Sequence, residues 1–594
     1  MKKSHILFAC LGFVGIAAAV LLSSGMTRCH AVAQRSSATT PELSAEADTA
    51  CKHILTAEEW ADSVMSTLTP RQRIAQLFFP RWETSASHTP ASVIDCDVVK
   101  EGVGGFLLGK GSAAEYADII NRAQGEAAVP LMVTLDGEWG ASMRVTDAPR
   151  FPKNIALGAI QDPSLLEKYG REVAEECKIL GIQVDFAPVL DVNSNPDNPV
   201  IGIRSFGEDP NRVASLGAAY CRGMESAGVM AVGKHFPGHG DTSVDSHKTL
   251  PTVNHDVKTL ESVDFVPFKA AIKSGISGMM VGHLQVPALD KNGTPASLSK
   301  KITTDILRNK LGFEGLIFTD ALAMKGANTP HQNNAVSAFM AGADILLQPR
   351  SLSHDIQAMV DAVASGKISQ EEVDSRCRRL LVYKHRLGLS ATVRVDKSNL
   401  KKRLDSSAAQ ALLGELSKAS ITVLRNDNDI LPLSDIEKKN IAVISLGAPS
   451  ANAFVSTCSR YTSVASISVN ASSEIPKALK AAEKADVVVV GVMKNNNITR
   501  EAYSRILKCN PEVVAAFFVN PFKLSSFGHI DSTPGVIMAY DDTPGLLDAA
   551  AQAIFGGIDV TGRFPVNVKG VGKLNDGIIL KKKDLDLLSR EKRG

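Results

Sequence analysis

The sequence predicts an α/β protein in which a (β/α)8 TIM-like barrel is followed by an α/β/α sandwich domain. Two observations carry this prediction. Short apolar segments alternate with stretches of helical periodicity between residues 76 and 347, and a second series of near-continuous apolar segments begins at residue 420. A chain of 594 residues is also too long for one ordinary hydrophobic core.

The barrel is predicted from eight candidate strands. Apolar residues recur at helical spacing between most of them, as in 164–180 and 210–227. Eight strands that alternate with helices favour a closed barrel, and a doubly wound open sheet is the structural alternative. The candidate strands lie at residues 76–79, 105–108, 131–135, 184–190, 229–232, 278–281, 315–319 and 344–347.

The second domain is predicted from apolar runs at 420–424, 441–444, 487–490, 514–519 and 535–538. Near-continuous apolar strands that alternate with helices, such as 404–418 and 473–484, indicate a parallel sheet covered on both faces. This domain carries no dense polar loop, so we expect a structural or substrate-flanking role. The predicted organisation is a signal peptide (1–33), a flexible leader (34–52), the catalytic barrel (53–390), a linker and helix (391–419) and the sandwich domain (420–594).

The N-terminus predicts export. Lys2 and Lys3 precede an apolar run over 6–22, and Ala31-Val32-Ala33 forms a small-residue cleavage site. This pattern is typical of a secretory signal peptide cut after Ala33, which places the protein in the periplasm or at the cell surface. An uncleaved membrane anchor is the alternative, because the apolar run is just long enough to span a bilayer. No later stretch is apolar enough, so we expect no stable membrane insertion after cleavage.

Composition excludes several partners. The net charge is +2, and no cluster of basic and aromatic residues indicates nucleic acid. The nine cysteines, of which Cys10 and Cys29 belong to the predicted signal peptide, show no CxxC spacing. Such a scattered set is typical of buried thiols with at most a single bridge and not of a disulfide scaffold or zinc site. Nothing in the sequence indicates an oligomeric state.

The densest polar segment is Lys234–Pro251, KHFPGHGDTSVDSHKTLP. Pro and Gly at 237, 238 and 240 predict a loop that leaves the strand at 229–232. A loop this polar, anchored by a buried strand, is more typical of a functional site than of an ordinary surface. Over residues 234–247 its ionisable side chains are Lys234, His235, His239, Asp241, Asp245 and His247.

Polar residues also follow four other predicted strands. The carboxyl ends of barrel strands share one face, where such barrels build their active sites. A single Asp after a strand is usually a turn former, but this many polar residues on one face favour a site. They are Asp136, Glu138 and Arg144 after the third strand, Asp191, Asn193 and Arg204 after the fourth, His283 after the sixth and Asp320 after the seventh.

Two chemistries fit these residues. In the first, Asp320 is a carboxylate nucleophile and Asp245 orients His247 as a general acid and base. In the second, His235, His239, Asp241 and His247 bind a divalent metal that activates water. The cation of Lys234 beside the cluster disfavours the metal, so we expect no metal and no organic cofactor.

The loop also resembles a known family. K-H-F-P-G-H-G-D-T followed by D-S-H resembles the signature of the β-N-acetylhexosaminidases of glycoside hydrolase family 3. The resemblance extends through most of the chain after the leader. Segments 317–324, 202–207 and 341–344 are similar to the family's nucleophile segment, arginine loop and last barrel strand, and 562–566 is similar to the end of its second domain.

The resemblance implies a retaining exo-β-N-acetylhexosaminidase that hydrolyses terminal β-linked GlcNAc through a covalent glycosyl-Asp intermediate. Its substrate would be a GlcNAc-containing oligosaccharide, with peptidoglycan fragments as the leading candidate. The implied catalytic residues are the nucleophile Asp320, the acid/base His247 and its orienting partner Asp245. The implied sugar-binding residues are Asp136, Arg144, Arg204, Lys234 and His235.

Other functions stay open. A family 3 β-glucosidase is disfavoured by the D-S-H sequence, and a non-catalytic exported sugar-binding protein would carry the same pocket without turnover. A neutral imidazole would tolerate an anionic acceptor, so a β-N-acetylglucosaminide phosphorylase is a further alternative. One departure from the family pattern is Trp139, where many members carry Gly, and it leaves the position of the loop after the third strand open.

Overall fold

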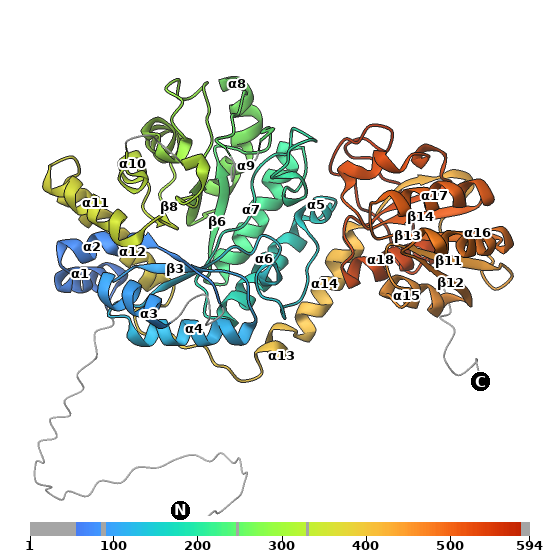
Figure 1. Cartoon of the computed structure of the whole chain (residues 1–594), viewed down its shortest axis with the longest axis horizontal. Coiled ribbons are helices and arrows are strands. Elements are labelled where there is room, and N and C mark those ends of the chain that lie inside the picture. The colour runs from blue at the N-terminus through green and yellow to red at the C-terminus, as the bar shows by residue number, and fades with distance from the viewer. Residues whose placement is uncertain (1–54, 85–90, 245–248, 328–331, 584–594) are drawn as a thin grey trace, which may run out of the picture. The chain divides into compact units, whose positions relative to one another are not determined.

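The computed structural model describes residues 55–84, 91–244, 249–327 and 332–583 (Figure 1). Its two sheets confirm the predicted fold class. The predicted signal peptide and leader lie outside the described residues, and so do Asp245 and His247. Within the part of the chain that the structure describes, no helix combines the length and the apolar character needed to cross a membrane.

The first sheet is a curled ring of parallel strands, with the order β2-β3-β4-β5-β6-β7-β8. β1 pairs with β9, and Ile345 beside β9 bridges Phe318 in β8, which closes the ring. All eight predicted barrel strands are present, the first one divided into β1 and β2 around Pro80. The strands are β1 Phe78–Phe79, β2 Arg81–Trp82, β3 Gly105–Leu108, β4 Met132–Leu135, β5 Val184–Asp185, β6 Met230–Phe236, β7 Gly278–Val281, β8 Leu316–Thr319 and β9 Leu346–Leu347.

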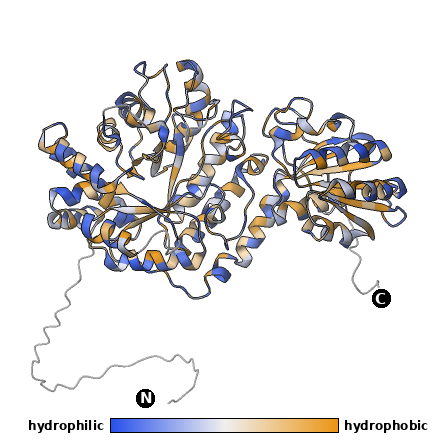
Figure 2. Cartoon of the chain, viewed as in Figure 1, coloured by the Kyte–Doolittle hydropathy of each residue, from blue (hydrophilic) through white to orange (hydrophobic). Residues whose placement is uncertain are grey.

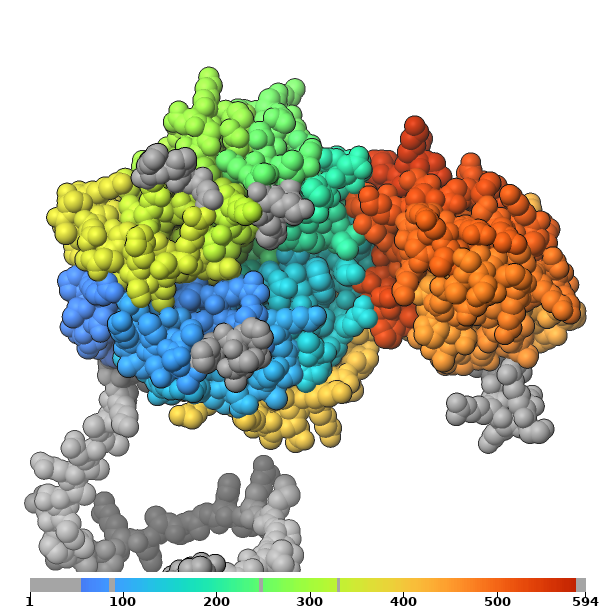
Figure 3. All heavy atoms as spheres, viewed as in Figure 1, coloured from blue at the N-terminus to red at the C-terminus, as the bar shows by residue number. Residues whose placement is uncertain are grey.

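Helices α1 to α14 accompany this ring. α6 and α7 begin alike, because Asp162 and Asp209 cap the first turn through the N–H groups of Ser164 and Asn211, and a proline follows each cap. The last barrel helix, α12, packs on α1, and Figure 3 shows these early (blue) and late (yellow) segments side by side. The helices are α1 Ala57–Thr67, α2 Pro70–Ala75, α3 Ala91–Ile94, α4 Ala113–Glu126, α5 Asn154–Leu157, α6 Pro163–Ile179, α7 Pro210–Ser226, α8 Val257–Thr259, α9 Phe265–Lys273, α10 Asn334–Ala341, α11 Leu352–Ala364, α12 Gln370–Arg386, α13 Leu400–Leu404 and α14 Ser407–Ser420.

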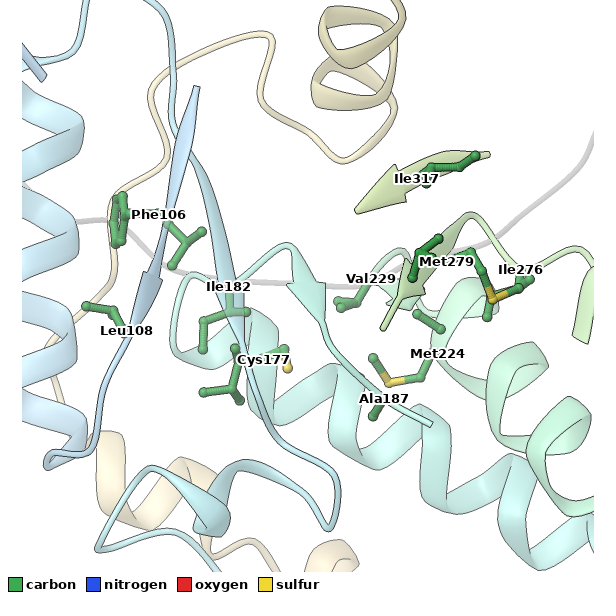
Figure 4. Close-up of a cluster of buried hydrophobic side chains, with 14 of the residues drawn as sticks. Phe106, Leu108, Cys177, Ile182, Ala187, Met224, Val229, Ile276, Met279 and Ile317 are labelled. Atoms are coloured by element: carbon green, nitrogen blue, oxygen red, sulfur yellow. The ribbon is translucent and has the colours of Figure 1, made fainter. Parts of the chain in front are cut away.

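Two layers of apolar side chains support the strands. Between strands and helices, Phe106, Ile182 and Met279 are fully or almost fully buried (Figure 4). Inside the ring, Phe186 and Phe318 meet edge to face, with ring centroids 5.5 Å apart. This interior layer fills the barrel and leaves room for a site only at its ends.

The second unit holds a six-stranded sheet in the order β10-β15-β14-β13-β11-β12. Its strands are apolar while its helices carry one polar and one apolar face (Figure 2). The strands are β10 Thr422–Asn426, β11 Ile441–Leu446, β12 Val464–Val469, β13 Val487–Val492, β14 Val513–Phe517 and β15 Gly535–Met538, and the helices are α15 Ala453–Tyr461, α16 Ile475–Lys484, α17 Asn497–Cys509 and α18 Pro544–Phe555.

This sheet differs from the prediction at its two edges. β10 runs antiparallel to β15, so the sheet is mixed and not fully parallel. An edge strand has one neighbour and is not bound by a helical crossover, which is why antiparallel edges occur on parallel sheets. The other edge strand, β12, was not predicted, because only two of its six residues are buried and its sequence, VASISV, lacks a continuous apolar run.

The second unit contacts the loop that leads into α7. The N–H of Glu208 donates to the carbonyl of Pro565 at 3.1 Å. A Cβ atom on Gly207 would lie 2.4 Å from that carbonyl oxygen, and the φ of Gly207 is +137°, so only glycine fits this close approach. Pro565 of the sandwich domain therefore contacts Gly207 and Glu208, which follow Arg204 in the chain.

Candidate active site

The carboxyl ends of the barrel strands surround a cavity of about 210 Å³. β4, β6 and β8 end beside it, and the loops that follow these strands supply most of its polar side chains. All the predicted sugar-binding residues and the predicted nucleophile line this one cavity. These residues are Asp136, Arg144, Arg204, Lys234, His235 and Asp320.

Two carboxylates bind three cations at one side of the cavity. Lys234 in β6 bonds both Asp136 and Glu138, with Nζ 2.8 Å from Oε1 of Glu138. Arg204 grips Glu138 with two bonds, Nη2 to Oε1 at 2.6 Å and Nε to Oε2 at 2.9 Å, while Arg144 bonds Asp136. Glu138 and Lys234 are buried, whereas Asp136, Arg144 and Arg204 are partly exposed where they line the cavity.

The network fixes the charges of its members. Burial alone raises the pKa of Asp136 and Glu138, but Lys234, Arg204 and Arg144 outweigh burial and hold both values below the ordinary range. Burial lowers the pKa of Lys234, and the two carboxylates raise it above its usual value. Asp136, Glu138 and Lys234 are therefore ionised at neutral pH, and the network presents charged donors and acceptors to a polyhydroxylated ligand.

His235 is oriented by Asp191, a fully buried carboxylate. Nδ1 of His235 lies 2.8 Å from Oδ2 of Asp191, and Nε2 lies 3.3 Å from Nη2 of Arg204. A guanidinium only donates, so Nε2 accepts and the ring proton sits on Nδ1, where it is donated to Asp191. Asp191 also accepts the backbone N–H of His239, at 2.7 Å. Asp191 thus binds the ring of His235 and the backbone of His239.

Asp320 follows the last residue of β8 and lines the cavity. Burial raises its pKa, but the nearby His283 and His235, the N–H of Ala321 at 2.7 Å and Lys234 lower it below the ordinary value. His283 accepts the hydroxyl of Ser297 at 2.6 Å and donates to the carbonyl of Ala321 at 3.0 Å, which holds the segment in place. An ionised, oriented carboxylate at this position can act as a nucleophile.

The polar loop begins later than predicted. Lys234 and His235 belong to β6, which runs through Phe236, so the prediction that they lie in a loop was wrong. Their backbone continues the ladder, because Val189 pairs with Lys234. The register shifts between Gly233 and Phe236, and Lys234 and His235 both line the cavity. The loop proper starts at Pro237, and the predicted acid/base pair Asp245 and His247 lies outside the described residues.

Residues far along the chain brace this loop. Asn198 donates to the carbonyls of His239 and Gly240, at 2.9 and 3.0 Å. His255 binds Asp264 at 2.7 Å and lies 3.5 Å from Asp241, and these acids raise its pKa. His255 therefore links Asp241 of the loop to Asp264, the residue that precedes α9.

Two of the residues that the metal alternative requires, His235 and His239, are engaged by other partners. Both ring nitrogens of His235 are engaged, and burial and the neighbouring His235 lower the pKa of His239 to about 4 while its Nδ1 contacts Thr242 at 2.7 Å. The cations of Lys234 and Arg204 stand beside them. Among residues 55–84, 91–244, 249–327 and 332–583, no group of three or more His, Cys, Asp or Glu side chains is arranged to hold a metal.

Sequence reasoning placed Glu138 and Asp191 on the correct face but gave neither a role, and it did not single out Asn198, His255 or Asp264. Glu138 had a signal, because it lies two residues from Asp136 on the same loop. Asp264 had none, since a lone Asp before a helical segment is read as a cap. Its contact with His255 is visible only in the fold.

Two family models match the chain. The glycosyl hydrolase family 3 N-terminal domain matches residues 69–382, which includes the whole cavity described above. The glycosyl hydrolase family 3 C-terminal domain matches residues 421–583, which includes the six-stranded sheet. The resemblance that the loop sequences indicated is thereby confirmed for both domains.

Curated relatives and solved structures are similar to the same regions. Beta-hexosaminidase A of Pseudoalteromonas piscicida is 36% identical over 58% of this chain, and a Cellulomonas fimi beta-N-acetylglucosaminidase/beta-glucosidase is 30% identical over 58%. The chain spans 62% and 63% of the length of these two relatives. The structure of a glycoside hydrolase family 3 beta-N-acetylglucosaminidase from Paenibacillus matches with a TM-score of 0.73 and 30% identity, over 84% of this chain and 99% of that one.

Proposed function

The chain belongs to glycosyl hydrolase family 3, and on this basis we propose that it is a retaining β-N-acetylhexosaminidase. The reaction would remove terminal β-linked GlcNAc from an oligosaccharide. The observation that carries the proposal is the position of Asp320, an ionised carboxylate in a cavity whose other side holds a charged network of sugar-binding type. The likeness to the Paenibacillus enzyme supports the choice of GlcNAc.

In the first step, the carboxylate of Asp320 attacks the anomeric carbon as the bond to the leaving oxygen breaks. The leaving oxygen takes its proton from the general acid, which we assign to His247 with Asp245 as its orienting partner. In the second step, His247 takes a proton from water, the water oxygen bonds to the anomeric carbon, and the bond to Asp320 breaks. Two inversions retain the β configuration.

The charged network would hold the sugar during both steps. Asp136 can accept a hydrogen bond from a sugar hydroxyl, while Arg144, Arg204 and Lys234 can donate to hydroxyl oxygens. Glu138 is buried and holds Arg204 and Lys234 in place. Because the two carboxylates and three cations fix one another, the donors and acceptors need little rearrangement when the sugar binds. Binding energy is therefore available to place the anomeric carbon next to Asp320.

A histidine as acid/base suits a site that already contains an anionic nucleophile. A second carboxylate close to Asp320 would raise one of the two pKa values, whereas a neutral imidazole adds no negative charge. The same neutrality would admit phosphate as the acceptor, so phosphorolysis is a variant to test.

We further propose that the protein is exported, with Gln34 as the first mature residue, and acts on peptidoglycan fragments or other GlcNAc-ended oligosaccharides. N-terminal sequencing of the secreted protein would test the cleavage site.

The test compares nitrophenyl β-GlcNAc with nitrophenyl β-glucoside, with and without phosphate. We expect kcat/KM to favour the GlcNAc compound by at least about 100-fold. A site that hydrogen-bonds the N-acetyl group of GlcNAc should reject the glucoside, which lacks that group. Equal rates on both compounds would favour the second candidate, a dual β-glucosidase, which the name of the Cellulomonas relative suggests. Binding without turnover of either compound would favour a sugar-binding protein.

A further inference from the structure

Two buried acids lie behind the sugar-binding network and take no part in the reaction proposed above. Asp185 is the last residue of β5 and is 0 % exposed, and Glu176 in α6 is 1 % exposed. Neither lines the cavity. Both lie under the loop 137–143, which connects Asp136 to Arg144 and carries Glu138.

Each acid binds one end of this loop through the backbone. Oδ1 of Asp185 accepts the N–H of Gly137 at 2.8 Å, and Oε2 of Glu176 accepts the N–H of Ala141 at 2.9 Å. The contacts are so close that a Cβ atom on Gly137 would lie 3.0 Å from Asp185, and one on Gly140 would lie 3.1 Å from Glu176. The loop therefore rests directly on the two carboxyl groups.

We propose that Asp185 and Glu176 are positioning residues for sugar binding, because they fix both ends of the loop that presents Asp136, Glu138 and Arg144. This inference rests on the proposed function, which makes Asp136 and Arg144 sugar ligands and Glu138 the buried partner of Arg204 and Lys234. It also accounts for Trp139, where the family pattern has Gly. The backbone on both sides of Trp139 is tied down, so the loop keeps its place.

The surroundings of the two acids fit this role. Burial raises the pKa of Glu176 to about 8 and that of Asp185 to about 7, although the backbone N–H groups that they accept act in the opposite direction. A carboxyl group that keeps its proton to this range accepts an amide N–H without placing another negative charge near Asp136 and Glu138. An uncharged amide should therefore replace either acid, whereas alanine should not.

The experiment compares Glu176→Ala with Glu176→Gln, and Asp185→Ala with Asp185→Asn. We expect the alanine variants to raise the KM for nitrophenyl β-GlcNAc about 10-fold or more, because a buried N–H loses its partner and the loop shifts. The amide variants, which keep an acceptor oxygen, should stay within about threefold of the wild type. A variant in which alanine leaves KM unchanged would overturn the proposal.

Glu225 provides a matched control. It is another mostly buried acid whose pKa is raised to about 7 by burial, and its carboxylate accepts the backbone N–H groups of Ser277 and Ala231, at 2.8 and 3.2 Å. These partners lie at the opposite ends of the strands, away from the cavity. Glu225→Ala should lower Tm but leave KM within about twofold, so an equal rise in KM would mean that the effect is general destabilisation.

Hydrogen exchange gives a readout that needs no substrate. Amides of segment 137–144 should exchange at least about tenfold faster in Glu176→Ala and Asp185→Ala than in the wild type or in Glu225→Ala. Unchanged exchange would contradict the loop anchoring itself. If the two alanine variants exchange faster but the wild-type protein hydrolyses no GlcNAc substrate, the acids anchor the loop as proposed while the proposed function fails.

Discussion

Glu138→Gln is the substitution that most directly probes the charged network. It keeps the size of the side chain and one acceptor oxygen but removes the charge that Arg204 and Lys234 share. The Glu138 side chain is 0 % exposed, and those of Lys234 and Arg204 are 3% and 22% exposed. Breaking a buried pair by neutralising one partner costs about 3–5 kcal/mol, because the remaining charges stay buried without compensation.

This cost should appear in both stability and catalysis. For a barrel of this size we expect Tm to fall by roughly 5 °C or more. A shift of Arg204 and Lys234 away from the sugar should lower kcat/KM for nitrophenyl β-GlcNAc about 100-fold, which corresponds to about 2.7 kcal/mol. Thermal unfolding and initial-rate kinetics on the same preparation measure the two effects.

The control is Glu167→Gln, which neutralises another glutamate paired with arginine. Glu167 and Arg222 are 39% and 47% exposed, with Nε of Arg222 2.9 Å from Oε2 of Glu167. An exposed pair of this kind contributes at most about 1 kcal/mol, so Tm and kcat/KM should hardly change. If Glu138→Gln behaves like Glu167→Gln, the network does not position the sugar-binding cations and the reasoning fails.

Three further predictions follow from the site and the core. Exhaustive EDTA treatment should leave activity unchanged, and activity lost and then restored by a divalent ion would return the metal hypothesis. Asp320→Ala should lower kcat by several orders of magnitude. His247→Ala should give a burst of nitrophenol followed by slow turnover that azide accelerates. A His247→Ala enzyme with wild-type turnover on natural fragments would refute the role of His247 as acid and base. Burial lowers the pKa of Lys384 from 10.5 to about 7, so Lys384 binds a proton less readily in the folded protein than in the unfolded chain. The resulting loss of folding free energy grows as the pH falls from 10.5 towards 7. Lys384→Met should therefore stabilise the protein at pH 7. Near pH 10 it should destabilise the protein, because Oε1 of Gln76 loses its hydrogen bond from Nζ of Lys384. Tm values that shift equally at both pH values would contradict this account.

The sequence was sufficient for most strands because a buried parallel strand is a continuous apolar run. It failed where burial is partial, as in β12, and where pairing decides direction, as in β10. It also assigned Lys234 and His235 to a loop, because Pro237, Gly238 and Gly240 follow them closely. A barrel strand can carry them at its carboxyl end, where the ladder continues but the core does not.

The site was predictable as a face but not as a set of contacts. Each polar residue follows a strand, and strand ends in a barrel converge, which brought Asp136, Lys234 and Asp320 together in the prediction. Partners such as Glu138 with Arg204, 66 residues apart, depend on side-chain placement that no local pattern encodes. Asp185 was read only as part of a strand, since nothing in its neighbours reveals that it binds the next loop.

The central claim is that Asp320 forms a covalent bond to the sugar, and trapping that bond tests it most directly. The intact protein would be incubated with a 5-fluoro-N-acetylglucosaminyl fluoride, in which the good leaving group permits the first step while the ring fluorine slows the second. Peptide mass spectrometry should then find one fluorosugar on the peptide that contains Asp320, and none in Asp320→Ala. An adduct on a different carboxylate, or turnover with release of the α anomer and no adduct, would contradict the account.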